Sequence, residues 1–507
     1  MLQESAPAAW PERAWLPAVL LLAGVLRFWE LGAQGLWADE AVCVVWASLP
    51  VGELLARLAS DTQSPLYFLL LKAWMSVLGD SEASVRALSA VAGLLAVRVL
   101  ARTVRRVSSW PVAAVSALLL AVSPMAVHYA RETRAFGLFI LTVTLALDAL
   151  VVGYRRPGAR GTAYLALATT LLLYTHNLGV FYGAAFYVVA ALLPTENRAA
   201  WWRTLLVAGG ASAVLFLPWL PTLVGQAQGV TTSYAWLTDA WERLFPWQVP
   251  TSLLALTPGA GPPVRNGIDA LGWVAVVTGV LGWFAAAWNT WRTEEPTLKL
   301  ALGATVVPLL MIFAYSAVAH PIHVVGRVDA AAVVPAAWAL GAAVTTLPRV
   351  ARVVGLATLL AASMVPLGQE IALDTRSQER AIARGLADAM GQGDVLVVAT
   401  AHRDTFAYYL QHLRPEVTVR GFPTGRDRNA FVIDENAPLP QDAATLEQEV
   451  RKALVGAGGR HVFVLSQPGP FRDHLHGALS SGYSPAGGQE VGFLQLAIHR
   501  FALAGAP

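Results

Sequence analysis

Long apolar stretches alternate with short polar segments along most of the chain. About eleven of these stretches approach the roughly 20 residues that a helix needs to cross a lipid bilayer. They lie at about 14–31, 84–104, 111–127, 135–152, 162–174, 178–193, 203–223, 268–290, 300–319, 329–346 and 351–367. The pattern predicts a multi-pass α-helical membrane protein with about 11 transmembrane helices.

A further apolar segment, Pro65–Leu78, does not fit this count as a full span. If it crossed the membrane, the cluster Arg102–Arg106 would face outward, against the rule that arginine-rich loops stay on the cytoplasmic side. We therefore expect a re-entrant or interfacial helix within a first outer loop at about 30–83. Such a segment suits a water-filled cavity.

Arginines in alternate loops predict the orientation of the chain. The clusters occur at Arg102–Arg106, Arg155–Arg160, Arg198–Arg203, Arg292–Lys299 and Arg349–Arg352. These loops and the N-terminus are expected in the cytoplasm, and the first helix is expected to be an uncleaved signal anchor. The predicted location is the plasma (inner) membrane.

The last part of the chain, 369–507, differs from the transmembrane domain predicted at 1–368. Charged residues become frequent, and short apolar runs alternate with helical patterns. The runs that predict strands are 394–400, 417–422, 461–466 and 492–501. They indicate a small soluble α/β domain. With an odd number of spans before it, this domain is extracytoplasmic.

Composition supports the membrane class and excludes others. Hydrophobic residues make up 56% of the 507 residues, which is more than one soluble core would bury. The net charge is only +3, so we expect no nucleic-acid partner. Cys43 is the one cysteine, which excludes an intrachain disulfide and a cysteine-based metal site.

Two adjacent carboxylates, Asp39 and Glu40, follow the first apolar stretch in the run GLWADEA. Only 14% of the chain is charged, and an ionisable group near bilayer depth costs about 2.5 to 3.5 kcal/mol. The pair is therefore a candidate for catalysis. It also suits the cap of the following helix, since acidic residues stabilise a helix N-terminus.

The predicted outward loops hold further polar residues that have no evident structural use: His128, Arg131, Glu132, Arg134, His176, His320, His323 and Arg327. Arginines clamp phosphate groups, and a carboxylate accepts a proton from an attacking hydroxyl. The set thus suits group transfer from a lipid phosphate. Pairing of the arginines with lipid headgroups is the alternative, and His320 and His323 fit a structural role.

The carboxylates and histidines of these loops could also assemble a divalent metal site. No ligand spacing within any one segment supports it, so we assign no metal ligand and no other cofactor.

Four segments carry a resemblance to a known family. They are Arg27 with Leu31-Gly32 and WADEA, then Asp61–Ala90, Ser123–Leu138 and Tyr174–Phe181. Their order resembles the GT-C class of membrane glycosyltransferases. The likeness is greatest to the superfamily of protein O-mannosyltransferases, aminoarabinose transferases and Rgt-like bacterial enzymes (glycosyltransferase family 39-like).

The resemblance implies a polyprenyl-phosphate sugar donor, an extracytoplasmic active site and Asp39 as the catalytic carboxylate. The chain departs from the family pattern at three places. Relatives often have Gln-Glu-x-Arg and an aromatic pair where 131–136 keeps the Glu and Arg but has other neighbours. Gln63-Ser64 stands where relatives usually have His-Pro, and Arg327-Val328 stands where they have Arg-Tyr.

We therefore expect a hexosyl- or pentosyltransferase that inverts the anomeric centre. Asp39 would deprotonate the acceptor, which is a lipid, glycan or protein. The remaining roles are phosphate binding by Arg131, Arg134 and Arg327, orientation by Glu40 and Glu132, support by His128 and His176, and a cavity wall with Tyr67. The donor tail would lie among membrane lipids between the spans.

Two alternatives belong to other classes. Membrane-embedded charge also marks transporters and flippases of lipid-linked intermediates, although no internal repeat is visible in this sequence. The chain could also be a binding or scaffold protein whose C-terminal domain is the active part.

Overall fold

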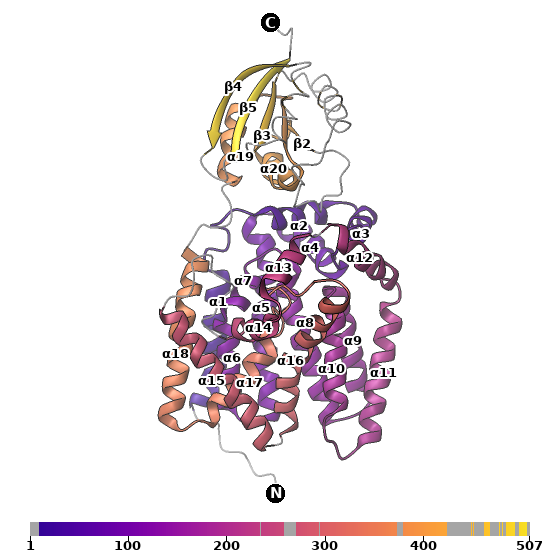
Figure 1. Cartoon of the computed structure of the whole chain (residues 1–507), viewed down its shortest axis with the longest axis vertical. Coiled ribbons are helices and arrows are strands. Elements are labelled where there is room, and N and C mark those ends of the chain that lie inside the picture. Colours follow the sequence, from indigo (N-terminus) through magenta and orange to yellow (C-terminus); the bar gives the residue numbers. More distant parts are fainter. Residues whose placement is uncertain are drawn as a thin grey trace. The chain divides into compact units, whose positions relative to one another are not determined.

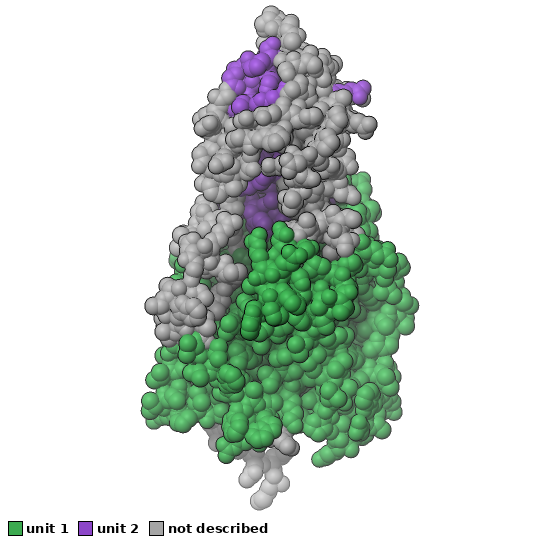
Figure 2. All heavy atoms as spheres, in the orientation of Figure 1, with its two compact units in different colours: residues 1–32, 50–231, 236–373 green, residues 33–49, 232–235, 374–507 purple. Residues whose placement is uncertain are grey.

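The computed structural model describes residues 10–233, 235–257, 270–293, 295–372, 379–422, 461–466, 483–491 and 496–503, with four isolated positions between them. The chain divides into two compact units, coloured separately in Figure 2. The first holds residues 1–32, 50–231 and 236–373. The second holds 33–49, 232–235 and 374–507. Residues 33–49 thus belong to the second unit, although the residues before and after them in sequence belong to the first.

The first unit is helical, with long helices running side by side in Figure 1. Its helices are α1 (Trp10–Phe28), α3 (Val51–Ala59), α4 (Pro65–Leu78), α5 (Glu82–Val107), α6 (Trp110–Val122), α7 (Pro124–Ala130), α8 (Ala135–Arg155), α9 (Ala159–Thr175), α10 (Gly179–Ala191), α11 (Arg198–Phe216), α12 (Leu220–Ser233), α13 (Ala235–Leu244), α14 (Gln248–Ala255), α15 (Ala270–Thr293), α16 (Pro296–Val318), α17 (Val333–Thr346) and α18 (Arg349–Ala372).

Among the described residues, five helices are long and apolar enough to cross a membrane. They are α5, α8, α11, α16 and α18. The consecutive helices α6 and α7 make a sixth if they count as one bent span. The larger count of eleven stays a prediction, because other expected spans coincide with shorter apolar helices. The segment expected to be re-entrant is the separate helix α4, with the bounds predicted for it.

The stretch 111–127, predicted as one span, is broken between α6 and α7 by a bend of 58°. Pro124 begins α7 and has no N–H to donate to the Leu120 carbonyl one turn earlier. The buried guanidinium of Arg27 supplies the missing donors, to the carbonyl oxygens of Leu120 at 3.3 Å and Ala121 at 2.9 Å. The carbonyl groups at the bend thus have hydrogen-bond donors.

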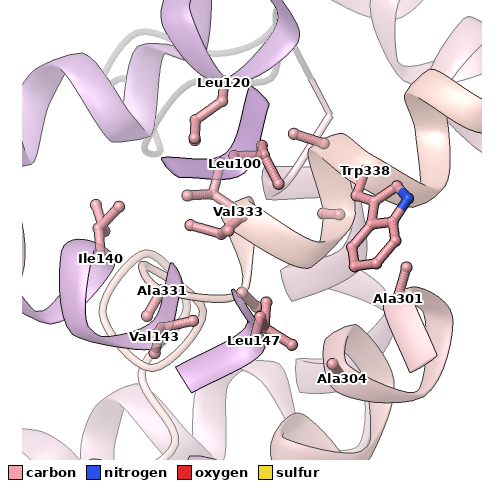
Figure 3. Close-up of a cluster of buried hydrophobic side chains, with 14 of the residues drawn as sticks. Leu100, Leu120, Ile140, Val143, Leu147, Ala301, Ala304, Ala331, Val333 and Trp338 are labelled. Carbon is pink, nitrogen blue, oxygen red and sulfur yellow. The ribbon is translucent and has the colours of Figure 1, made fainter. Parts of the chain in front are cut away.

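Helices α5, α6, α8 and α17 share the core of the first unit. Figure 3 shows its apolar side chains, among them Leu100, Ile140 and Trp338. Helices α6 and α17 approach so closely that a Cβ on Gly341 would lie 2.3 Å from Ser116 Oγ. Small residues permit such contact between membrane helices.

A buried carboxylate joins three helices of the first unit, α5, α8 and α9. Asp148 in α8 is fully buried and accepts hydrogen bonds from Arg102 at 3.0 Å, Thr103 at 2.6 Å and Tyr164 at 3.0 Å. It also pairs with Arg106. Because its partners lie on α5 and α9, this cluster fixes both helices to α8.

The second unit contains a mixed five-stranded sheet in the order β2-β1-β3-β5-β4. Its elements are α2 (Ala38–Ser48), α19 (Glu379–Ala389), β1 (Val395–Ala399), α20 (Thr400–Leu413), β2 (Thr418–Phe422), β3 (His461–Ser466), β4 (Tyr483–Val491) and β5 (Leu496–Leu503). Strand β1 is parallel to β2 and β3, and β5 is antiparallel to β3 and β4. Helix α20 packs on β1 and β2.

The sheet confirms the α/β character predicted for the end of the chain. Strands β1, β2 and β3 coincide with predicted strands, and β5 covers the described part of the fourth. Strand β4 was not among the strands predicted from the sequence. It contains Pro485, Gly487 and Gly488, and its register with β5 shifts at that point, so no alternating pattern is visible in its sequence.

Candidate active site

The two adjacent carboxylates begin helix α2 in the second unit, and they differ in environment. Glu40 is fully buried, and its Oε2 accepts a hydrogen bond from the N–H of Trp37, the N-cap residue, at 3.4 Å. Asp39 is only half-buried. The capping role is therefore realised by Glu40, and Asp39 is the carboxylate of the pair that retains access to solvent.

In the first unit, the two predicted arginines at the junction between α7 and α8 lie in different environments. Arg131 is buried, and its guanidinium donates to the carbonyl oxygens of Trp29 at 2.7 Å and Leu26 at 3.4 Å. These carbonyls end α1, where a helix has no intrahelical donors left. Arg131, the C-cap residue of α7, thus ties the end of α7 to the end of α1.

His128 lies between two carboxylates. Its Nε2 is 3.3 Å from Glu132 Oε1, and its Nδ1 is 2.9 Å from Glu370 Oε2 in α18. A protonated imidazole carries an N–H on both nitrogens and satisfies both carboxylates. His128 and Glu132, each predicted separately as a supporting residue, are thus brought together, with Glu370 as a third member that sequence reasoning missed.

His176 connects α9 to α10 and lies among aromatic rings. Its ring centre is 4.9 Å from that of Phe136 and 5.0 Å from that of Phe139, and its Nδ1 accepts the N–H of Leu178 at 3.1 Å. Burial, followed by the positive charges of Arg134 and Arg327, lowers the pKa of His176 to about 3. The ring is therefore neutral at physiological pH.

Two of the predicted arginines belong to segments that meet at the rings of Phe136 and Tyr129, whose centres are 4.5 Å apart, because Arg134 lies over Phe136 and Tyr129 bonds the residue before Arg327. Arg134 extends over the ring of Phe136, with the guanidinium carbon 5.9 Å from the ring centroid. Both Arg134 and Arg327 are half-buried. Two partly exposed guanidiniums beside a neutral histidine form a cationic site suited to an anion such as phosphate.

Tyrosines from two helices hold the segment that carries Arg327. The Tyr129 hydroxyl donates to the carbonyl of Gly326, and the Tyr182 hydroxyl donates to the carbonyl of Val328 at 2.7 Å. Gly326 has a φ of 88°, a left-handed conformation that favours glycine. The backbone on both sides of Arg327 is therefore fixed.

Tyr67, predicted as a wall of the cavity, is fully buried in α4. The start of α4 is held through Asn177, whose side chain bonds Ser64 Oγ at 2.7 Å, the Thr62 carbonyl at 2.9 Å and Gln226 at 2.9 Å. Asn177 directly follows His176. The polar residue at the family's departure point, Ser64, is thus part of a network that ties α4 to the α9–α10 turn.

Asp329 is a second residue that sequence reasoning missed. It follows Arg327 by two positions and is fully buried. A carboxylate at the edge of an apolar stretch is a signal of the same kind as Asp39. Asp329, however, is the first residue of the predicted span 329–346, and its charge was not considered separately.

In the described part of the chain, no group of three or more His, Cys, Asp or Glu residues is placed to hold a metal ion.

Comparisons with known proteins agree with this architecture. Residues 62–224 match the family described as Dolichyl-phosphate-mannose-protein mannosyltransferase. These residues include α4, the α7–α8 junction and the α9–α10 turn. A search of curated proteins by sequence found no match.

Among solved structures, the chain is similar to ArnT from Cupriavidus metallidurans. In the apo state the identity is 15% and the TM-score 0.61, over 96% of this chain and 98% of that one. ArnT bound to undecaprenyl phosphate gives 15% and 0.60, over 97% and 98%. The Archaeoglobus fulgidus oligosaccharyltransferase, in complex with Zn and sulfate, gives 13% and 0.55, over 89% and 67%.

The protein is thus a multi-pass membrane protein with the fold of the GT-C glycosyltransferases. The resemblance inferred from its sequence, to the superfamily of protein O-mannosyltransferases and ArnT-like enzymes, is confirmed.

Proposed function

We propose that the protein transfers a hexosyl or pentosyl sugar from a polyprenyl-phosphate donor to an acceptor outside the cytoplasm, with inversion at the anomeric carbon. The observation that carries the proposal is a pair of half-buried guanidiniums: Arg134 lies over the ring of Phe136, and Arg327 follows the Gly326 carbonyl that Tyr129 binds, with the rings of Phe136 and Tyr129 4.5 Å apart. A phosphate ester is the anion that such a pair recognises, through bidentate hydrogen bonds.

The lipid nature of the donor is supported by the related ArnT structure, which contains undecaprenyl phosphate. A polyprenyl chain is apolar and lies among membrane helices without a dedicated soluble pocket. The acceptor, whether lipid, glycan or protein, reaches the site from the extracytoplasmic side.

In the proposed reaction, Asp39 removes the proton from an acceptor hydroxyl or amine. The acceptor atom then forms a bond to the anomeric carbon, and the bond from that carbon to the phosphate oxygen breaks. The departing phosphate takes the electron pair and its charge is stabilised by Arg134 and Arg327. Glu40 fixes the start of α2 behind Asp39, and Arg131 fixes the end of α1.

The acidic cluster has a supporting role in the proposal. Glu132 and Glu370 hold His128, which joins α7 to the last turn of α18. His176 contributes a neutral ring against Phe136 and Phe139. Tyr67 is buried in α4, whose start Asn177 holds through Ser64.

The test is turnover of a panel of polyprenyl-phosphate sugars by the purified protein, with released polyprenyl phosphate measured by mass spectrometry. We expect Asp39→Asn to reduce the release by about 10²-fold or more, because an amide accepts no proton at neutral pH. The matched control is Glu53→Gln in α3, which changes an exposed carboxylate in the same outer loop and leaves the release unchanged.

Equal release by wild type and Asp39→Asn would remove Asp39 from the mechanism. If folded wild type releases nothing from any donor in the presence of acceptors, the transferase proposal fails and transport of lipid-linked intermediates becomes the stronger hypothesis.

A further inference from the structure

Helix α2, which carries Asp39 and Glu40, belongs to the same compact unit as the C-terminal region. In sequence it lies between α1 and α3, both of which belong to the other unit. The described residues of 33–49 and 374–507 are among the purple parts in Figure 2. The proposed catalytic carboxylate is therefore carried on a segment whose packing partners are more than 300 residues away, since Leu36 and Tyr409 are separated by 373 positions.

The packing partner of α2 is α20, the helix that also covers strands β1 and β2. One side of α2 is buried, including Val44, Trp46 and Ala47. On α20, Phe406, Tyr409 and Leu410 are buried as well. An apolar helix face of this kind fixes the position of α2 along its length.

Two hydrogen bonds fix the turn that leads into α2. The N–H of Leu36 donates to the Tyr409 hydroxyl at 2.6 Å, and both residues are buried. The Arg380 guanidinium in α19 donates to the carbonyl of Ala33. Leu36 precedes the N-cap residue, so these bonds set where the first turn of α2, with Asp39, begins.

We propose that the C-terminal domain positions the catalytic helix, and that Tyr409 and Arg380 are its positioning residues. This inference rests on the proposed function of Asp39 as the general base. Neither residue touches the reacting atoms in this proposal. Each acts through the backbone of residues 33–36, so that the sheet domain serves as the rigid support from which α2 presents its carboxylate.

The prediction concerns Tyr409→Phe in the full-length protein. The phenyl ring keeps the packing of α20 but removes the only atom that accepts the bond from Leu36. Displacement of a catalytic group by about 1 Å can cost 10²-fold in rate. We expect kcat to fall about 10- to 100-fold while the KM for the donor stays within about twofold, because the phosphate-binding arginines belong to the other unit.

A second readout does not depend on activity. Hydrogen exchange measured by mass spectrometry on a peptide covering residues 33–41 reports the Leu36 amide directly. We expect exchange there to become about tenfold faster in Tyr409→Phe, with exchange in strands β1 and β3 unchanged.

Arg380→Gln provides an independent variant should Tyr409→Phe fold poorly. Its matched control is Arg384→Gln, one turn further along α19, where the side chain is exposed. The expected result is a lower kcat for Arg380→Gln and wild-type kinetics for Arg384→Gln.

The outcomes are distinct. Wild-type kcat in both Tyr409→Phe and Arg380→Gln, whatever the exchange, overturns the positioning role while leaving the proposed function intact. A parallel loss of kcat and rise of KM also overturns it, because it indicates general damage. Absence of turnover in the wild-type protein overturns the proposed function and, with it, this inference.

Discussion

His176 lies against the rings of Phe136 and Phe139, and burial together with the charges of Arg134 and Arg327 disfavours a positive charge on its imidazole. Its folded-state pKa of about 3 is below the ordinary value of 6.5. The unfolded chain therefore takes up the proton first. The stabilisation from the neutral ring is fully present above pH 6.5 and is lost as pH falls through the interval toward 3.

We predict that wild-type protein loses stability on acidification, by about 1.4 kcal/mol for each pH unit below 6.5 from this group. In His176→Gln this contribution is absent, so the dependence on pH between 7 and 5 is shallower, although the variant is less stable at pH 7. Thermal unfolding in detergent at a series of pH values measures it.

The matched control is His320→Gln, which removes a histidine after the end of α16. It keeps the slope of the wild-type protein. Indistinguishable slopes for wild type and His176→Gln would contradict the assignment of a neutral, buried ring.

Single residues also show what the sequence could reveal about the site. Asp39 and Glu40 stood out because paired carboxylates are rare in so apolar a chain. Their division into a cap and a half-buried carboxylate depends on helix geometry that sequence does not specify. Arg131 and Arg134 are three positions apart and looked alike, yet one bonds the carbonyls that end α1 and the other lies over an aromatic ring.

Among the helices, the Asp148 cluster is a buried polar link that joins α5, α8 and α9. Breaking a buried ion pair costs about 3–5 kcal/mol, but the partner guanidiniums are 54% and 36% exposed and regain water. We predict that Asp148→Ala lowers the free energy of unfolding by about 2 kcal/mol, since α5, α8 and α9 lose their common acceptor.

Turnover per folded molecule should stay at the wild-type level, because no proposed active-site residue belongs to this cluster. The control is Glu12→Ala, whose bond to Arg105 at 2.9 Å lies at the surface. Its effect is expected to be within about 0.5 kcal/mol. If Asp148→Ala and Glu12→Ala lower the free energy of unfolding equally, the burial of Asp148 does not strengthen its ion pairs.

Helix positions were predictable wherever an apolar stretch is long and uninterrupted. The stretch 84–104 lies within α5, and 135–152 lies within α8. The bend between α6 and α7 was not predicted, because hydropathy continues across Ser123 and Pro124 and only the missing N–H of the proline marks it. Strand β4 escaped detection for the opposite reason, since its glycines and proline weaken the alternation.

At the scale of the whole molecule, the packing of α2 on α20 bears on topology. Helices α2 and α20 pack together in one unit, so we predict that they lie on the same side of the membrane. The sequence could not reveal this contact, because nothing local marks residues 373 positions apart as neighbours. The prediction of an extracytoplasmic C-terminal domain came instead from counting spans.

We predict that a cysteine at Ala381 in α19 reacts with a membrane-impermeant maleimide in intact spheroplasts. A cysteine at Gly158, in an arginine-rich loop, reacts only after permeabilisation. Both positions are exposed. The lone Cys43 is buried and is replaced by serine to remove background. Labelling of Gly158→Cys in intact spheroplasts, or its absence at Ala381→Cys, would contradict the proposed orientation.

Tyr129 and Tyr182 hold the segment around Arg327 through hydrogen bonds from their hydroxyl groups. Both hydroxyls bind main-chain carbonyls, which every amino acid possesses. Apart from Gly326, whose left-handed φ favours glycine, the support therefore does not depend on the side chain at position 327. Replacement of Arg327 would therefore change the side chain at this position without removing either of the two hydrogen bonds that hold the segment in place.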